Sequence, residues 1–146
     1  MGFNWEGFAV KRILRLPGPL IAAVAVLLLG FLFLIMTVNR NPLHIYVLPE
    51  GFHGAVEVTF DQAGSPPLEK DGNSYIYYIP PSGKLKTSSP MQSGPLEVMY
   101  ADKGGRRTPV SPNELHGVAS GSNDGVSTAY LFIGTKAQYE EYVKQL

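Results

Sequence analysis

The sequence predicts a mainly β protein, in which one N-terminal transmembrane helix precedes a small antiparallel β-sandwich or partly open barrel that ends in a C-terminal α-helix. Three observations predict this fold class. Residues 20–38 are an uncharged apolar run, the chain beyond Pro42 consists of short β-like runs separated by Gly, Pro, Asn and Asp, and the last residues show helical spacing. The expected divisions are a cytoplasmic basic N-terminus (1–15), a transmembrane helix (16–39), a linker with the first strand (40–47) and an extracytoplasmic β-domain (48–146).

The apolar run 20–38 is 19 residues long. As a helix it reaches roughly 29 Å, which matches the ~30 Å hydrocarbon thickness of a bilayer. Pro17 and Pro19 suit a helix start, and residues 39–42 suit its end. A cleavable signal peptide is the alternative, but its apolar run is usually shorter and is followed by small residues, and no A-x-A pattern follows this run. We therefore expect an uncleaved anchor.

The basic residues predict the orientation of this anchor. Three of them precede the apolar run, whereas Arg40 alone follows it closely. Under the positive-inside tendency the N-terminus faces the cytoplasm, and the β-domain lies outside the plasma (inner) membrane of a bacterium. The three basic residues before the run are Lys11, Arg12 and Arg15. The aromatic residues Phe3, Trp5 and Phe8 are expected to lie at the level of the lipid headgroups.

The composition of the β-domain excludes several classes of function. Eight basic and eleven acidic residues follow Asn41, which gives this part a net charge of −3 and disfavours nucleic-acid binding. The chain has no cysteine. This excludes a disulfide framework, a thiolate metal site and the lipid anchor of a bacterial lipoprotein.

Seven short runs predict strands, separated by turn residues. Alternation in residues 55–60 places Val56, Val58 and Phe60 on a buried side, and residues 75–79 are apolar on both sides, as expected of a strand between two layers. Asp102 to Gly105 predict a hairpin turn. The predicted strands are 44–48, 55–60, 75–79, 85–88, 96–101, 106–110 and 128–133.

A C-terminal helix is predicted over residues 136–145. Thr135 and Gln138 have the spacing of a capping box. The apolar stripe of this helix, which we expect to pack on a sheet, consists of Ala137, Tyr139, Tyr142, Val143 and Leu146.

Residues 48–90 contain the pattern PEGF-G-V, PPL, G, Y-IP-G and TSSP in this order. This pattern resembles that of an uncharacterised bacterial family of small secreted or membrane-tethered β-domains. The resemblance implies a sandwich similar to transthyretin-like or carboxypeptidase-regulatory domains and a surface location, and it implies no activity. The matching positions are Pro49, Glu50, Gly51, Gly54, Pro66, Pro67, Leu68, Gly72, Ile79, Pro80, Gly83, Thr87, Ser88 and Ser89.

Two segments carry groups that catalysis could use. Glu50 and His53 could form an acid/base pair, but Gly51 and Gly54 beside them favour a tight turn at the start of a strand. The hydroxyls of residues 87–90 are interpreted as bonding the backbone at a strand end.

Other motifs fall short of known sites. The histidines His44, His53 and His116 lack ligand spacing, residues 71–73 and 122–125 lack the rest of a calcium loop, and residues 117–121 and 82–84 each miss a nucleophile motif by one position. We therefore assign no catalytic, cofactor-binding or metal-binding residue and expect no cofactor.

Binding surfaces are predicted in two places. The tyrosines at 75, 77, 78, 100 and 130 could form a stacking platform on one sheet face, although core packing is the default role of strand aromatics. Residues 111–125 are polar and Gly-rich, and we expect them to form a loop that serves as a binding surface.

The favoured function is a non-enzymatic binding or interaction module that acts on a protein or peptide partner in the envelope. One alternative is a small envelope hydrolase that uses Glu50, His53 or Asp61. The other is a structural subunit of a membrane complex.

Overall fold

The computed structural model describes residues 17–38 and 41–146. The chain divides into two units, one that ends at Arg40 and one that spans Asn41–Leu146, and each is described by itself. The predicted basic N-terminus and the aromatic anchor of Phe3, Trp5 and Phe8 lie outside the described residues, as does Arg40.

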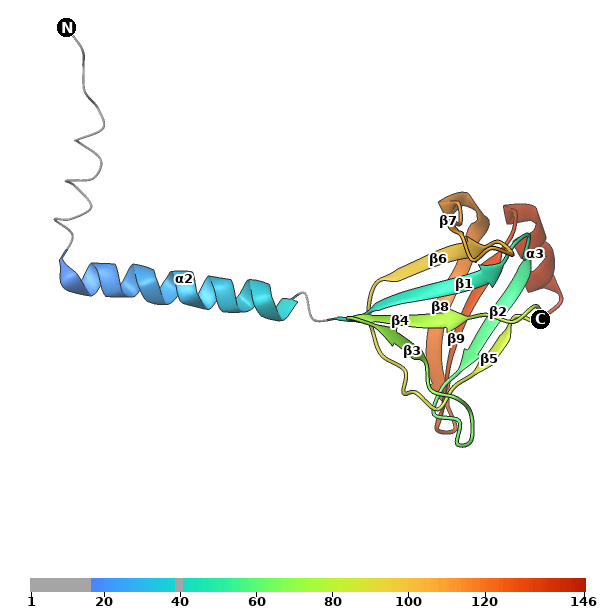
Figure 1. Ribbon diagram of the computed structural model, residues 1–146, viewed down its shortest axis with the longest axis horizontal. Helices are drawn as coiled ribbons and strands as arrows, with labels where there is room; N and C mark the ends of the chain where they lie inside the picture. The colour runs from blue at the N-terminus through green and yellow to red at the C-terminus, as the bar shows by residue number, and fades with distance from the viewer. Residues whose placement is uncertain (1–16, 39–40) are drawn as a thin grey trace, which may run out of the picture. The chain divides into compact units, whose positions relative to one another are not determined.

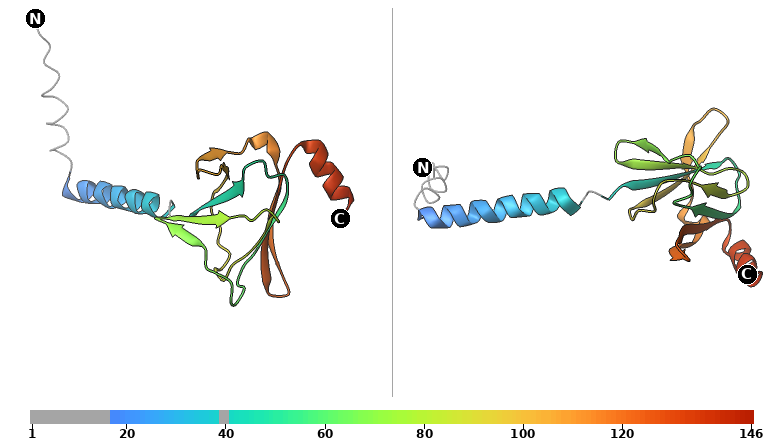
Figure 2. Two further views of the ribbon diagram at one scale, coloured as in Figure 1. Left: turned by 45° about the vertical axis from the view of Figure 1, so that its right-hand side comes forward. Right: turned by 90° about the horizontal axis from the view of Figure 1, so that it is seen from below.

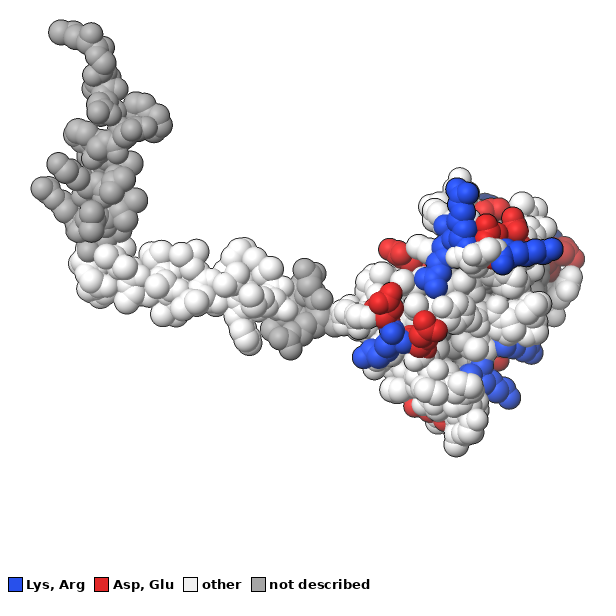
Figure 3. Space-filling view, in the orientation of Figure 1, with Lys and Arg blue, Asp and Glu red and all other residues white. Residues whose placement is uncertain are grey.

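The described part of the first unit is one α-helix, α2 (Gly18–Val38), as the apolar run predicts. It starts at Pro17, whose carbonyl accepts a hydrogen bond from the Leu20 backbone N–H. Every side chain described in this helix is exposed, and Figure 3 shows no charged group on it. Among the described residues, α2 is the one helix that is long enough and apolar enough to cross a membrane, judged by length and composition. Membrane association or a signal peptide would account for both properties.

The second unit contains two β-sheets and a C-terminal helix (Figures 1 and 2). Sheet A has the strand order β3-β4-β1-β6-β7, and sheet B has the order β5-β2-β9-β8. The bounds are β1 (Leu43–Pro49), β2 (Gly54–Thr59), β3 (Glu69–Asp71), β4 (Ser74–Tyr78), β5 (Lys84–Lys86), β6 (Leu96–Ala101), β7 (Arg107–Pro109), β8 (Leu115–Asn123) and β9 (Val126–Ile133). The prediction of a mainly β fold with an apolar helix before it and an α-helix after it is confirmed.

The strand pairing is mixed, so the predicted antiparallel arrangement is wrong for three pairs. β1 is parallel to both β4 and β6, and β2 is parallel to β5. The chain passes to sheet B through β2 after β1, and again through β5 after β4. After β2 the chain re-enters sheet A as β3 and turns back as β4, which is parallel to β1, and after β5 it re-enters as β6, which is also parallel to β1. Both crossovers thus pass through a strand of sheet B instead of the usual helix.

The core lies between the two sheets. Leu48 of β1, Val58 of β2 and Ile133 of β9 are completely buried in it. The predicted alternation of β2 is confirmed, because Val56, Val58 and Phe60 are all buried. The prediction that residues 75–79 are buried on both sides is confirmed at Ile76 and Tyr77, but it is wrong at Tyr78, which is half exposed.

Residues 111–125 are not the loop that their polar composition predicts. They form a short 3-10 helix, η1 (Pro112–Glu114), and the long strand β8, which pairs with β9. The hairpin turns at Asp124 and Gly125, which both have positive φ, the conformation that a tight hairpin turn requires. The strongly β-forming sequence of β9 thus supports a partner strand that would not be predicted alone.

The helix α3 (Lys136–Lys144) confirms the predicted C-terminal helix and its capping box. The Gln138 N–H donates to Thr135 Oγ1, and the Thr135 N–H donates to Gln138 Oε1. The helix packs on the outer face of sheet B, where Tyr139 and Tyr142 contact the ring of Phe132.

Candidate binding cavity

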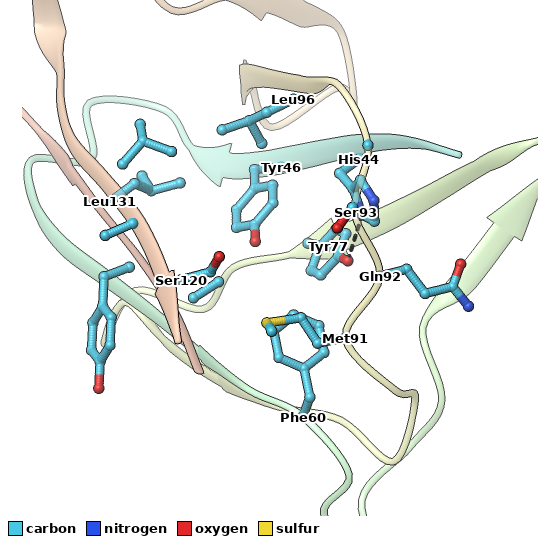
Figure 4. A pocket seen from close by; sticks show the side chains of 15 residues that line it. His44, Tyr46, Phe60, Tyr77, Met91, Gln92, Ser93, Leu96, Ser120 and Leu131 are labelled. Atoms are coloured by element: carbon cyan, nitrogen blue, oxygen red, sulfur yellow. Dashed lines mark hydrogen bonds between the residues drawn. The ribbon is translucent and has the colours of Figure 1, made fainter. Parts of the chain in front are cut away.

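A cavity of about 370 Å³ lies between the two sheets. Figure 4 shows its walls: His44, Tyr46 and Tyr77 come from sheet A, and Leu131 faces them from sheet B. The segment between β5 and β6 contributes Met91, Gln92, Ser93 and Gly94. The cavity therefore lies between the middle of sheet A and the β8–β9 hairpin.

Stacked aromatic rings form the wall on the sheet A side. The rings of Tyr46 and Tyr77 are stacked at 4.4 Å between centroids, with 11° between their planes. The ring of Phe60 meets Tyr77 edge-on at 6.2 Å. Because β1 and β4 are paired in register at Tyr46 and Tyr77, the backbone holds these two rings together. This wall offers ring faces and hydroxyls to the cavity.

His44 is the most unusual group in the cavity, because it is a buried imidazole at 6% exposure. Its Nδ1 is hydrogen-bonded to the Tyr77 hydroxyl at 2.7 Å. Its Nε2 is buried and has no hydrogen-bond partner among the described residues. Burial lowers the pKa of His44 below its ordinary value, and the Ser93 backbone acts more weakly in the opposite direction. The imidazole is therefore neutral at neutral pH.

The two cavity tyrosines are also neutral. Burial raises the pKa of Tyr46 to about 12. Burial raises the pKa of Tyr77 as well, and the neighbouring Tyr46 and Tyr75 raise it further. Both hydroxyls thus keep their protons at physiological pH and can donate hydrogen bonds.

The facing wall belongs to the β8–β9 hairpin. Val118 and Ser120 of β8 line it together with Ala129 and Leu131 of β9. No Asp, Glu, Lys or Arg is among the described residues that line the cavity. Such a site suits an uncharged ligand with apolar groups and a few hydrogen-bonding atoms, and its described residues offer no paired acid and base.

The residues predicted as a catalytic alternative lie elsewhere. Glu50 and His53 are exposed in the turn between β1 and β2, and among the described residues no hydrogen bond joins their side chains. Asp61 follows the opposite end of β2, which is about 20 Å of extended chain away from His53. Gly51 and Gly54 have positive φ, in agreement with the tight turn that was favoured for this segment.

The hydroxyl cluster at residues 87–90 has the structural role predicted for it. Thr87 Oγ1 donates to the Pro66 carbonyl and accepts from the Ser89 N–H. Ser89 Oγ accepts from the Leu68 N–H at 2.9 Å. These bonds join the PPL and TSSP segments of the sequence pattern, which are about twenty residues apart.

The remaining predicted candidates are dispersed. Tyr77 is buried, whereas Tyr78 and Tyr130 are half exposed on different sheets, so the five tyrosines form no single platform. His116 stacks on Tyr139 of α3, far along the chain from His44 and His53. In the described residues no group of three His, Asp or Glu side chains could hold a metal ion.

Sequence reasoning missed His44 and Tyr46 as site residues. A signal was present, because His44, Tyr46 and Leu48 occupy alternate positions of one strand and so share a face. A histidine on a face otherwise occupied by core residues is an indication of a buried polar contact.

A second hollow, of about 400 Å³, lies on the outer side of sheet B beneath α3. Tyr130, Tyr142, Val143 and Leu146 are among the residues that line it. It is mainly apolar and has no counterpart of the His44–Tyr77 hydrogen bond.

A family model described as "Family of unknown function (DUF6843)" matches residues 40–143, which include the whole described β-unit except its last residues. The chain belongs to this family. Residues 48–90, on which the resemblance to an uncharacterised family was based, lie within the matched range. A likeness to transthyretin-like or carboxypeptidase-regulatory sandwiches stays a prediction.

Among solved structures, the fold is similar to the crystal structure of a "Putative Lipoprotein from Bacillus anthracis". The TM-score is 0.55 and the sequence identity is 22%, over 68% of this chain and 74% of that chain. At this identity the likeness shows a shared fold. A comparison with proteins of curated function finds no match.

Proposed function

We propose that this DUF6843 protein is a membrane-anchored binding module, whose β-unit lies outside the cytoplasmic membrane and holds an uncharged part of an envelope protein or peptide between its two sheets. The observation that carries the proposal is the cavity of about 370 Å³, which offers neutral hydrogen-bonding groups among apolar walls. Cavities of this size and chemistry are typical of ligand sites.

The proposed anchor is α2. Its apolar side chains are exposed along the whole described helix, and lipid would remove them from water. The similar Bacillus anthracis protein is named a lipoprotein, whereas this chain has no cysteine to carry a lipid. A helix in the bilayer would then replace the lipid, and the positive-inside tendency would place the β-unit outside.

Fractionation and topology mapping test the anchor. The full chain with a C-terminal tag should stay in the membrane pellet after alkaline carbonate extraction, and protease added to spheroplasts should remove the tag. A mature chain that starts after Val38 and appears in the soluble fraction would overturn the anchor.

A binding selection tests the cavity. Full-length protein in nanodiscs is presented to a phage-displayed library of random decapeptides, and the affinities of the selected peptides are measured by titration. Filling the cavity with Ser120→Trp should weaken binding at least tenfold, because the indole would occupy the space between the sheets. The matched control is Val143→Trp beneath α3, which should leave affinity within a factor of two. Equal affinity for both variants and the native protein would exclude the cavity as the site.

A further inference from the structure

The two sheets have four edge strands, and three of them are protected against pairing. β3, β5 and β7 have three residues each. Two charged residues or more lie in β3 and β5, and β7 contains Arg107 and Pro109. Short length, charge and proline are the usual means by which native proteins prevent further strands from adding to an edge.

β8 has none of these protections over its second half. It is nine residues long, with the sequence LHGVASGSN, and contains no charged residue. The irregularity between His116 and Ala119 disturbs its first half, but the pairs from Ala119↔Tyr130 to Asn123↔Val126 are regular. In the described residues no strand lies on the other side of β8, so residues 119–123 present a free edge of backbone N–H and C=O groups.

This free edge borders the cavity. Ser120 lines the cavity and is paired with Ala129, which lines it too, so this row of side chains faces sheet A. Figure 4 shows Ser120 on the opposite side of the cavity from His44 and Gln92. A strand added beside β8 would direct every second side chain into the gap between the sheets, because side chains alternate along a strand.

We propose that β8 binds an extended peptide segment of a partner as an additional strand of sheet B, an inference that rests on the proposed binding function and specifies its ligand. Backbone hydrogen bonds to residues 119–123 supply affinity, and the cavity selects the side chains. Since the lining residues are uncharged, the inserted positions of the partner are apolar, alternating with positions that face solvent.

A second copy of this chain fits the edge less well than a peptide of this kind. Pairing of β8 with another β8 would bring Ser120 and Ser122 to the inner side, as small polar residues that leave the cavity unfilled. An apolar residue at the same depth would instead contact Leu96, Met91 and the ring of Tyr46.

N-methylation of the selected decapeptides tests strand addition in the full-length protein in nanodiscs. Each selected peptide is made in two forms, one methylated on the backbone nitrogens of its even positions and one on those of its odd positions. In an added strand the N–H groups of one of these two sets point toward β8, so one form alone loses hydrogen bonds to β8. We expect that form to lose at least tenfold in affinity and the other form to stay within a factor of three of the unmethylated peptide.

Variants on β8 supply the second measurement. Ser120→Lys places a charge at the inner side of the edge and should weaken peptide binding at least tenfold. Val143→Lys, in the hollow beneath α3 and outside the proposed edge, is the matched control and should change affinity less than threefold.

The outcomes separate this inference from the proposed function. Peptides that bind the cavity with equal sensitivity to both methylation series would overturn strand addition and leave the binding function intact. A library that yields no cavity-dependent binder would overturn both. Light scattering that shows a dimer abolished by Ser120→Lys, with no peptide bound, would replace the peptide by a second copy.

Discussion

Nδ1 of His44 lies 2.7 Å from the hydroxyl of Tyr77, and this hydrogen bond joins two residues 33 positions apart on the parallel strands β1 and β4. Both groups are buried, and the ring of Tyr46 covers Tyr77 on one side. Both residues line the cavity, so the same hydrogen bond contributes to the stability of sheet A and to the chemistry of the proposed site.

Removing the Tyr77 hydroxyl should destabilise the fold. Tyr77→Phe leaves Nδ1 of a buried imidazole without a partner, which costs about 1–3 kcal/mol of the free energy of unfolding. Urea denaturation of the full chain in detergent micelles, followed by near-UV circular dichroism, measures the change. The matched control is Tyr78→Phe, whose half-exposed hydroxyl accepts from Arg107, and its effect should stay within about 0.5 kcal/mol. Equal losses in both variants would contradict the importance of the buried pair.

His44 should make stability depend on pH below its ordinary pKa. The pKa of His44 is lowered from 6.5 in the folded state, so the unfolded chain binds the proton first. The free energy of unfolding should be level between pH 6.5 and about 10, and it should fall as the pH decreases from 6.5 toward the folded-state pKa of His44. His44→Gln should flatten this slope between pH 6.5 and about 5, where carboxylates begin to contribute. A native slope that survives the substitution would assign it to other groups.

The cavity tyrosines should titrate late. With a pKa of about 12 for Tyr46, and a raised pKa for Tyr77, the folded chain keeps protons that unfolded tyrosines release near pH 10. Stability should therefore decrease as the pH rises above about 10. Ultraviolet difference titration near 295 nm should show a late phase that shrinks in Tyr46→Phe. A single phase near pH 10 in the folded protein would contradict the burial.

Thr87 should be a stability residue. Its hydroxyl donates to the Pro66 carbonyl and accepts from the Ser89 N–H, and the side chain is 1% exposed. Thr87→Val keeps the shape but loses both bonds, at a cost of about 1–3 kcal/mol. The exposed neighbour Ser88→Ala is the control for the same denaturation experiment. Full stability of Thr87→Val would show that water satisfies both backbone groups.

Gly94 should tolerate no side chain. A Cβ at this position would meet the Pro42 carbonyl and the imidazole of His44. Gly94→Ala should therefore lower the free energy of unfolding by about 1–3 kcal/mol through overpacking and should disturb the His44–Tyr77 bond. Gly121→Ala, which meets open space, should change it by less than about 1 kcal/mol. Equal stability of the two variants would mean that the segment beside His44 moves freely.

Local patterns predicted the elements that local physics determines. The apolar run of α2, the alternation of Val56 and Val58, and the Thr135–Gln138 capping box each depend on residues within a few positions of one another. The bond between the Ser89 N–H and Thr87 Oγ1 was predicted for the same reason, because hydroxyls next to a strand end bond nearby backbone, whereas the bond from Thr87 to Pro66 is non-local.

Non-local pairing explains what was missed. β8 has too many glycines and serines to be predicted as a strand, and it is extended because β9 pairs with it along its length. The parallel neighbours of β1 follow from the path of the chain between two sheets, which no window of sequence contains. The cavity depends on both, since its walls combine β1 and β4 with the β8–β9 hairpin.

The position of β1 in sheet A has a mechanical consequence. This strand follows α2 after a few residues, and it is the central strand, with parallel partners on both sides. A pull on the chain from α2 would act along β1 and load the hydrogen bonds of both ladders in shear at the same time, instead of opening them one by one. The unit should consequently withstand traction through its N-terminal attachment better than it would if β1 were an edge strand.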